Sequence, residues 1–248
     1  MRIAGVTALV TGGAQRLGRA IAMALAREGV DIAVHYRTSE AEAARTVRDL
    51  RTCGVRAEAF RADLALPDES RALAHEVAQS LGPWRILVNN ASRFVANGPA
   101  SLSLDDVRVD AAIHLEAPLI LSQALDAQLP DGDHGAIVNL LDHRAVHPDP
   151  RYASYSLAKA SLGALTSLLA QSLAPRIRVN AISPGAILPP PELDAAAGRE
   201  HLERVAARTP LERPGTEEDI AAACLFLVRD ADFTTGTTIP VDGGKHLR

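Results

Sequence analysis

Hydrophobic positions along this chain fall into two kinds of segment that alternate from one end to the other. Short runs of β-branched and other apolar residues are typical of strands, and longer segments of alanine, leucine and arginine between them are typical of helices. This alternation predicts parallel strands joined by right-handed crossovers. Near-continuous apolar runs such as residues 86–88 indicate a sheet that is covered on both faces.

The pattern predicts seven strands and six helices. The strands are Thr7–Val10, Ile32–Tyr36, Ala57–Arg61, Ile86–Asn89, Ala136–Leu140, Arg178–Ile182 and Thr237–Val241. The helices are Arg16–Glu28, Ser39–Cys53, Asp68–Leu81, Leu104–Leu129, Tyr152–Leu173 and Thr216–Val228. A proline-rich, irregular stretch runs from Ser183 to about Ala197. A long loop beyond the carboxyl edge of a sheet is a candidate lid, so we expect a substrate loop at about residues 184–200.

The composition fits one globular domain over residues 1–248. The chain has 248 residues, is 47% hydrophobic and has a net charge of −4. The mild negative charge and the lack of a basic run argue against a nucleic-acid partner. The first apolar run, Ile3–Val10, is too short for a signal peptide, and no run is long enough to span a bilayer. We therefore expect a cytoplasmic protein with no membrane partner.

Cysteine and histidine spacing gives no sign of a disulfide framework or a metal site. Cys53 and Cys224 are far apart in sequence and fit a reduced intracellular protein. His143 and His147 are four residues apart, but no third ligand accompanies them. We expect no bound metal.

A glycine-rich turn, Thr11–Gly18, joins the first strand to the first helix. Glycines such as Gly12 let backbone amides approach a phosphate, and the N-terminus of a helix favours anions. The position of the turn in the first strand–helix unit predicts a dinucleotide site. The alternative is an ordinary turn that needs glycine for its backbone geometry.

The second strand ends in residues 35–39 without the acidic residue that usually meets a free ribose 2′-hydroxyl. Arg37, Thr38 and Ser39 could donate to a 2′-phosphate, with help from Arg16 in the glycine turn. This indicates NADP(H). The alternative is a solvated loop in which Ser39 caps the next helix.

Two residues follow the third strand at a position that suits the adenine ring. Asp63 could accept from the adenine amino group, with Leu64 beside it. A turn that leads into the next helix explains the same residues equally well.

Lys159 is one of only two lysines in the chain, against 24 arginines, and it follows Tyr155 by four residues. Residues i and i+4 share one face of a helix, so the ammonium can approach the phenol. A nearby cation favours phenolate, so we expect a lowered pKa for Tyr155, which makes it a candidate proton donor. The alternative is an accidental pair on a surface helix.

The glycine turn, Asn89-Asn90-Ala91, Tyr155-xxx-Lys159 and Ser183-Pro184-Gly185 occur in an order that resembles the short-chain dehydrogenase/reductase family. The resemblance implies an α/β, single-domain Rossmann fold with a doubly wound, seven-stranded parallel sheet and helices on both faces. It implies Tyr155 as the acid and Lys159 as the residue that holds the nicotinamide ribose. The further cofactor contacts that it implies are Leu17, Tyr36, Asn90, Ala91, Pro184, Gly185 and Ile187.

Two positions depart from the usual family pattern. Asp142 stands where the family has a serine, and His114 lies where an asparagine is usual. An aspartate beside a phenol can orient or help to protonate a ring nitrogen. The alternative is that Asp142 only caps a turn and the protein has lost activity. His114 could replace the asparagine that holds a water, or could merely fill space.

These departures are similar to those of pteridine reductases. Residues 11–18 with Arg16, the stretch Asn89–Phe94 and the Asp142, Tyr155 and Lys159 set carry this resemblance, and His114 and residues 243–248 look like bacterial dihydromonapterin reductases. The resemblance implies that Phe94 stacks on the pterin, that Ser92 and Arg16 contact pterin or phosphate, and that Leu188 lies at the substrate. Phe94 could also be ordinary core packing.

The sequence therefore predicts an NADPH-dependent reductase of a pterin or dihydropterin, with dihydromonapterin, dihydrobiopterin and dihydrofolate as candidates. One alternative is a short-chain carbonyl reductase, for example of 3-oxoacyl thioesters. Another is an NADP-binding sensor or structural subunit without catalysis. Residues 161–174 carry no charge, so that helix could pack between the sheet and a neighbouring subunit, or lie in the core of a monomer. A homotetramer is the expectation from the family.

Overall fold

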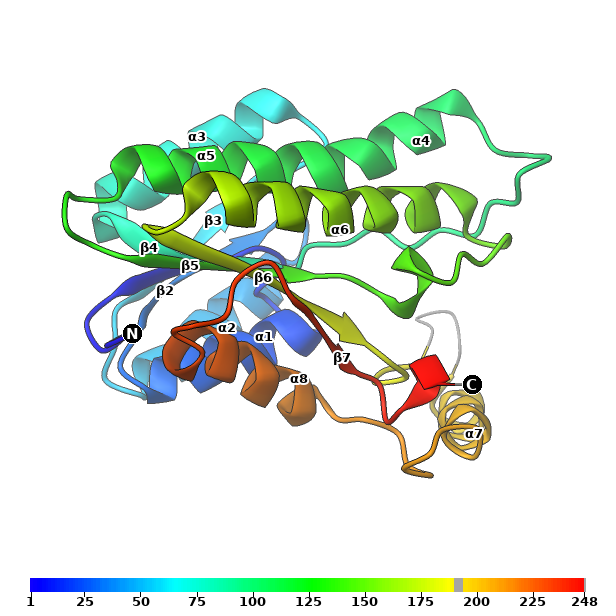
Figure 1. The fold of residues 1–248 in the computed structure, drawn as a ribbon. Coiled ribbons are helices and arrows are strands. Elements are labelled where there is room, and N and C mark those ends of the chain that lie inside the picture. The colour runs from blue at the N-terminus through cyan, green and yellow to red at the C-terminus, as the bar shows by residue number, and fades with distance from the viewer. Residues whose placement is uncertain (190–193, 248) are drawn as a thin grey trace.

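Figure 1 shows the computed structural model of the chain, which describes residues 1–189 and 194–247. Seven parallel strands form one sheet in the order β3-β2-β1-β4-β5-β6-β7. The strands are β1 Thr7–Val10, β2 Asp31–Tyr36, β3 Ala57–Arg61, β4 Trp84–Asn89, β5 Gly135–Leu140, β6 Ile177–Pro184 and β7 Thr238–Val241. The order reverses between β1 and β4, which confirms the predicted doubly wound Rossmann sheet.

Helices cover both faces of the sheet (Figure 1). One face carries α1 Arg16–Arg27, α2 Glu40–Arg51 and α8 Glu217–Leu225. The other carries α3 Pro67–Leu81, α4 Leu104–Ala111, α5 Ala117–Gln128 and α6 Ala153–Leu173. A further helix, α7 Ala195–Ala206, lies beyond the ends of β6 and β7 near the C-terminus.

Alternate strand residues divide the core into two layers. In β1, Ala8 and Val10 pack against the side of α1 and α8, whereas Leu9 packs against the side of α3 and α5. This alternation follows from the two-residue period of a strand, and it buries both faces. Within the described ranges, no helix is long and apolar enough to cross a membrane.

The predicted helix over 104–129 contains a break. The α-helical geometry ends at Ala111, a π-helical turn spans Ala112–Glu116 (η1), and α5 follows. A second π-helical turn, Phe226–Asp230, continues α8. Such turns often occur at functional sites, and the first one carries His114.

The predicted substrate loop is only partly irregular. Pro184 is the last residue of β6, and α7 begins at Ala195, so residues 195–200 are helical. The Asp194 carboxylate caps α7 by accepting from the amides of Ala196 and Ala197, each at 2.9 Å. We did not predict this helix. Its N-cap residue and the three alanines that follow come directly after a run of prolines, which indicates irregular structure. Residues 190–193, including Pro190 and Pro191, lie outside the described residues.

Candidate active site

The Tyr155 hydroxyl donates to Oδ2 of Asp142 across 3.2 Å. Tyr155 lies in the first turn of α6 and is 5% exposed, and Asp142 follows the end of β5. The other carboxylate oxygen, Oδ1, accepts from the backbone amide of Arg144 at 2.8 Å and from Arg144 Nη1 at 3.2 Å. Asp142 therefore caps a turn and also contacts the phenol, so it does more than cap the turn.

Lys159 is buried one turn further along α6. Its ammonium donates to the Leu140 carbonyl at 2.6 Å and lies 5.6 Å from the centre of the Tyr155 ring. Burial lowers the pKa of Lys159 to about 8. Burial of the phenol, and then the negative charge of Asp142, raise the pKa of Tyr155 well above its ordinary value. The expectation of a lowered Tyr155 pKa is wrong for this arrangement, because burial and Asp142 outweigh the opposing effects of Arg144 and Ser92.

A small aromatic group lies beside the phenol. The Phe94 and Tyr152 rings stack with centroids 4.1 Å apart, and Phe94 meets Tyr155 edge to face at 4.9 Å. The Arg144 guanidinium carbon is 5.2 Å from the Phe94 centroid and 5.0 Å from that of Tyr152. Phe94 is half-buried in a loop and belongs to neither core layer, so core packing does not explain it. Sequence reasoning missed Arg144 and Tyr152. The signal for them is their position: Arg144 lies two residues after Asp142, and Tyr152 lies three residues before Tyr155.

His114 lies beside the same phenol and contacts Ser92. His114 Nε2 lies 3.0 Å from Ser92 Oγ, and the imidazole meets the Tyr155 ring edge to face at 5.4 Å. Burial, and then the charge of Lys159, lower the pKa of His114 well below its ordinary value. The structure therefore groups Ser92, Phe94, Asp142, Tyr155 and His114.

The loop that carries Ser92 and Phe94 is fixed to α4 and α6. Arg93 donates to Asp106 at 2.9 Å and to the buried carboxylate of Asp110 at 3.1 Å. Asn97 donates to Ser154 Oγ at 2.8 Å. An ion pair to a buried carboxylate holds the loop more firmly than surface contacts would.

The glycine turn lies against the end of β4. Gly12 has a φ of 61°, and the Asn90 side-chain amide donates to the carbonyls of Thr11 at 2.9 Å and Gly12 at 3.1 Å. A side chain at Gly18 would overlap the Gly12 carbonyl oxygen, and one at Gly12 would come within 3.0 Å of the Ala91 Cα. This close backbone approach is the form of a phosphate-binding turn. Leu17 lies in the first turn of α1 and is partly buried against the core.

A pocket of about 260 Å³ opens at the end of β2, and its lining is Tyr36, Arg37, Thr38, Glu40 and Arg61. Two guanidinium groups and a hydroxyl against one carboxylate suit a phosphate, so these residues fit NADP(H). Ser39 is at the N-cap of α2 without a capping bond from its side chain, which accepts from Gln15 at 3.4 Å. We missed Arg61, which closes this pocket from the neighbouring strand β3.

Arg16 is not among the residues that line this phosphate pocket. It has a φ of 51°, an unusual conformation for a residue other than glycine, and its Nη2 donates to the Pro189 carbonyl at 3.2 Å. Arg16 therefore links the glycine turn to the loop after β6. Its expected contact with pterin or phosphate stays a prediction.

The remaining predicted residues lie at strand ends. Asp63 Oδ1 accepts from the Ala65 amide at 3.0 Å, a contact that belongs to the turn leading into the next helix. Leu64 is buried in the core. After β6, the Gly185 amide donates to Val241 at 3.0 Å, Ile187 is buried and Leu188 is half-buried. All of them follow strands of the parallel sheet at its carboxyl edge.

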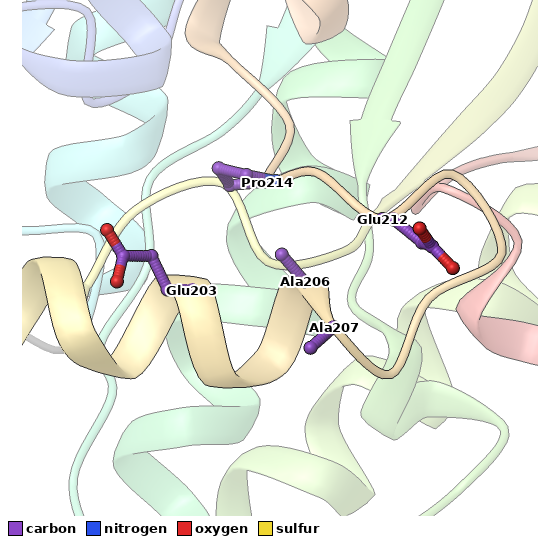
Figure 2. Close-up of a pocket in the computed structure, with 5 residues that line it drawn as sticks. All are labelled: Glu203, Ala206, Ala207, Glu212 and Pro214. Atoms are coloured by element: carbon purple, nitrogen blue, oxygen red, sulfur yellow. The ribbon is translucent and has the colours of Figure 1, made fainter.

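A second, shallow pocket of about 450 Å³ lies at the end of α7, lined by Glu203, Ala206, Ala207, Glu212 and Pro214 (Figure 2). None of these is a predicted site residue, and its two carboxylates do not suit an anionic cofactor. Within the described chain, no group of three metal-binding side chains occurs. The His143 and His147 rings stack on each other at 4.6 Å.

The family model for enoyl-(acyl carrier protein) reductase matches residues 12–246. The chain belongs to the short-chain dehydrogenase/reductase family. It is 36% identical to an uncharacterized oxidoreductase of Mycobacterium tuberculosis over 98% of this chain and 93% of that protein. It is 34% identical to the 3-oxoacyl-[acyl-carrier-protein] reductase FabG of Staphylococcus aureus over 97% of this chain and 98% of that protein.

Two solved structures of short-chain dehydrogenase/reductase fold are similar over almost their whole length. FolM alternative dihydrofolate reductase 1 from Brucella canis, complexed with NADP, has a TM-score of 0.91, 35% identity, and coverage of 100% of this chain and 97% of that one. A short-chain dehydrogenase from Burkholderia cenocepacia in complex with NADP has a TM-score of 0.89, 35% identity, and coverage of 99% of both chains. The chain therefore has the oxidoreductase fold of its family throughout.

Proposed function

We propose that the chain is an NADPH-dependent reductase of a pterin or dihydropterin ring, of the dihydromonapterin or dihydrobiopterin type. The observation that carries this proposal is the contact between the Tyr155 hydroxyl and the Asp142 carboxylate at 3.2 Å. Asp142 occupies the position at which the family usually has a serine. The same position in a carbonyl reductase holds a neutral hydrogen-bond donor.

The charge of Asp142 favours a ring nitrogen over a carbonyl oxygen. Reduction of a carbonyl builds negative charge on the oxygen that Tyr155 must protonate, and a carboxylate beside that oxygen opposes this charge. Protonation of a ring C=N group instead builds positive charge on nitrogen, which a carboxylate stabilises. Asp142 also keeps Tyr155 as a phenol, so the acid holds its proton until the substrate takes it.

NADPH would lie along the carboxyl edge of the sheet, with its phosphates at Gly12 and at the pocket that Arg37, Thr38 and Arg61 line. When bound, it supplies the hydride for the ring carbon. Tyr155 delivers the proton to the adjacent nitrogen, and Asp142 orients the phenol. Lys159, held by the Leu140 carbonyl, would hold the cofactor ribose.

The aromatic group beside Tyr155 supports a flat substrate. Phe94 forms one wall, because Tyr152 supports it from behind at 4.1 Å and Tyr155 meets its edge. A stacked ring on such a wall suits a planar bicyclic substrate. The similarity to FolM alternative dihydrofolate reductase 1, at 35% identity, points in the same direction and makes dihydrofolate a candidate substrate as well.

A carbonyl reductase is the second candidate function. Similarity to FabG, at 34% identity over 97% of the chain, favours a 3-oxoacyl thioester as its substrate. The two functions differ in their need for Asp142. Serine at this position would restore the family's usual donor and remove the charge that opposes an oxyanion.

NADPH oxidation with dihydromonapterin, dihydrobiopterin, dihydrofolate and a 3-oxoacyl thioester tests these candidates. We expect turnover of at least one pterin, and we expect Asp142→Ser to abolish it while leaving or raising thioester reduction. Good thioester reduction with no turnover of any pterin would overturn the proposal. A protein that binds NADPH but reduces nothing, with Tyr155→Phe unchanged in every assay, would instead be a sensor or structural subunit.

We also propose a homotetramer, in which the outer face of α6 contacts a second subunit. This face carries Leu157, Ala160, Ala164 and Leu168, and the two leucines are 58% and 64% exposed. A stripe of small and apolar residues suits close packing against a helix. Analytical ultracentrifugation tests this; replacement of Leu168 by glutamate should lower the assembly state.

A further inference from the structure

His114 lies in the π-helical turn η1, with 1% of the residue exposed. Both of its ring nitrogens have a partner. Nδ1 is 3.0 Å from the backbone oxygen of Asp110, and Nε2 is 3.0 Å from Ser92 Oγ. The ring therefore bridges a main-chain carbonyl and a side-chain hydroxyl at the edge of the active site.

The carbonyl partner determines where the proton of the ring lies. The Asp110 oxygen can only accept, so Nδ1 must carry the proton. Burial opposes a second proton on the ring, and so does the charge of Lys159. Nε2 is therefore an acceptor, and Ser92 donates its hydroxyl proton to it. Transfer of a proton from His114 to a Tyr155 phenolate would need an imidazolium, which this environment disfavours.

Ser92 also lies near Tyr155, because the imidazole that it contacts meets the Tyr155 ring edge to face at 5.4 Å, and its hydroxyl opposes the rise in the Tyr155 pKa. While Tyr155 is a phenol, its own proton points to Asp142. Once the phenol has lost that proton, the phenolate oxygen becomes a stronger acceptor than a neutral imidazole nitrogen. The single proton of Ser92 thus has two acceptors within reach.

We propose that His114 is a positioning residue: it holds the Ser92 hydroxyl beside Tyr155, so that Ser92 donates to the phenolate oxygen left when Tyr155 gives its proton to the substrate. This inference rests on the proposed role of Tyr155 as the acid. The Tyr155 proton moves to the substrate nitrogen, and the Ser92 proton turns from Nε2 to the phenolate without leaving Oγ. No bond to Ser92 or His114 forms or breaks.

The titratable and charged groups around the phenol come from three elements. Asp142 and Arg144 face it from the turn after β5, Lys159 faces it from α6, and the neutral His114 faces it from η1. Ser92 is the uncharged donor among them. The arrangement gives His114 a role that differs from filling space, since both nitrogens are used and one of them directs Ser92.

A double-mutant cycle separates this role from a purely structural one. His114→Phe keeps a flat ring against Tyr155 and removes both nitrogens, and Ser92→Ala removes the hydroxyl. We expect each change to lower kcat for dihydropterin reduction about tenfold, and we expect no further loss from His114→Phe when Ser92 is already alanine. NADPH affinity should be unchanged in all four proteins. Additive losses would overturn the proposal. His75→Asn, on the exposed face of α3, is the matched control.

Nitrogen NMR of the histidine side chains tests the same arrangement without a substrate. We expect the His114 signals, assigned by their loss in His114→Phe, to show a protonated Nδ1 and a hydrogen-bonded, unprotonated Nε2. Ser92→Ala should move the Nε2 signal toward that of a free nitrogen. A protonated Nε2, or an Nε2 signal that ignores Ser92→Ala, contradicts the inference. The expected spectra together with no pterin turnover would overturn the proposed substrate and leave the link between His114 and Ser92 standing.

Discussion

Arg144 holds Asp142 at two points, through its backbone amide at 2.8 Å and through Nη1 at 3.2 Å. Both bonds reach Oδ1, which leaves Oδ2 to the Tyr155 hydroxyl. The same guanidinium lies beside Phe94 and Tyr152. The Arg144 side chain thus connects Asp142, the partner of Tyr155, with the stacked rings of Phe94 and Tyr152. Arg144 does not belong to any of the family motifs.

Arg144→Met should weaken catalysis more than it weakens folding. Loss of the Nη1 bond leaves Asp142 held by one backbone amide, so the carboxylate orients Tyr155 less well. We expect kcat/KM for a dihydropterin to fall about tenfold. This is the smallest effect usual for the loss of a hydrogen bond between charged groups, and we expect it because Arg144 is 26% exposed. Steady-state kinetics with NADPH in excess measure this.

Arg151→Met is the matched control for Arg144→Met. Arg144 and Arg151 both pair with Asp149, and Arg151 lies near Tyr152 as well. The Arg151 side chain is 77% exposed, however, and makes no contact with Asp142 in the described structure. We expect kcat/KM within about twofold of the original value. A large loss for Arg151→Met, or none for Arg144→Met, would remove the assigned role.

Lys159 should make stability depend on pH. Its pKa falls from 10.5 to about 8 on folding because the ammonium is buried, so the unfolded chain binds the proton more tightly. Stability should therefore rise as the pH increases from about 8 to 10.5, by about 3 kcal/mol from this residue. Urea unfolding at a series of pH values measures this rise. The Lys159→Met protein should lack it, and equal pH dependence in both proteins would show that the lysine is not responsible.

The strands and the family motifs were predictable because they are local. The predicted strand Ile86–Asn89, for example, begins with three apolar residues. The observed strand β4 has the same last residue and begins two residues earlier, at Trp84. The residues of the candidate site at strand ends follow from the parallel sheet, since every strand ends at the same edge. Helix α7 was missed because prolines precede it and its cap, Asp194, has no hydrophobic pattern around it.

Contacts between distant residues were not predictable. Arg61 joins the phosphate pocket because β3 lies beside β2, and Arg144 reaches Phe94 across a gap of fifty residues in sequence. The spacing of Tyr155 and Lys159 placed both on one helix face but contained no information about burial. The direction of the Tyr155 pKa depends on that burial and on Asp142, so it required the structure.

Arg61 and Arg37 should determine the preference for NADPH over NADH. Both line the pocket at the end of β2, where the 2′-phosphate is proposed to bind. We expect Arg61→Ala and Arg37→Ala each to raise the Kd of NADPH about tenfold and to leave that of NADH unchanged, because only NADPH has the extra phosphate. Fluorescence titration measures both constants. Arg71→Ala, an exposed arginine on α3, should change neither. An equal loss for both cofactors would place the phosphate elsewhere.

Arg93→Ala should destabilise the protein and loosen the loop that carries Ser92 and Phe94. Asp110 is fully buried and pairs with Arg93, so removal of the arginine leaves a buried carboxylate without its cation. We expect the free energy of unfolding to fall by about 3 kcal/mol. This is the lower end of the range for breaking a buried ion pair, because Arg93 is itself 25% exposed. Arg108→Ala, on the same helix as Asp110 but with an exposed partner, should cost less than about 0.5 kcal/mol. Urea unfolding compares the two variants; equal costs would mean that the Arg93 pair does not fix the loop.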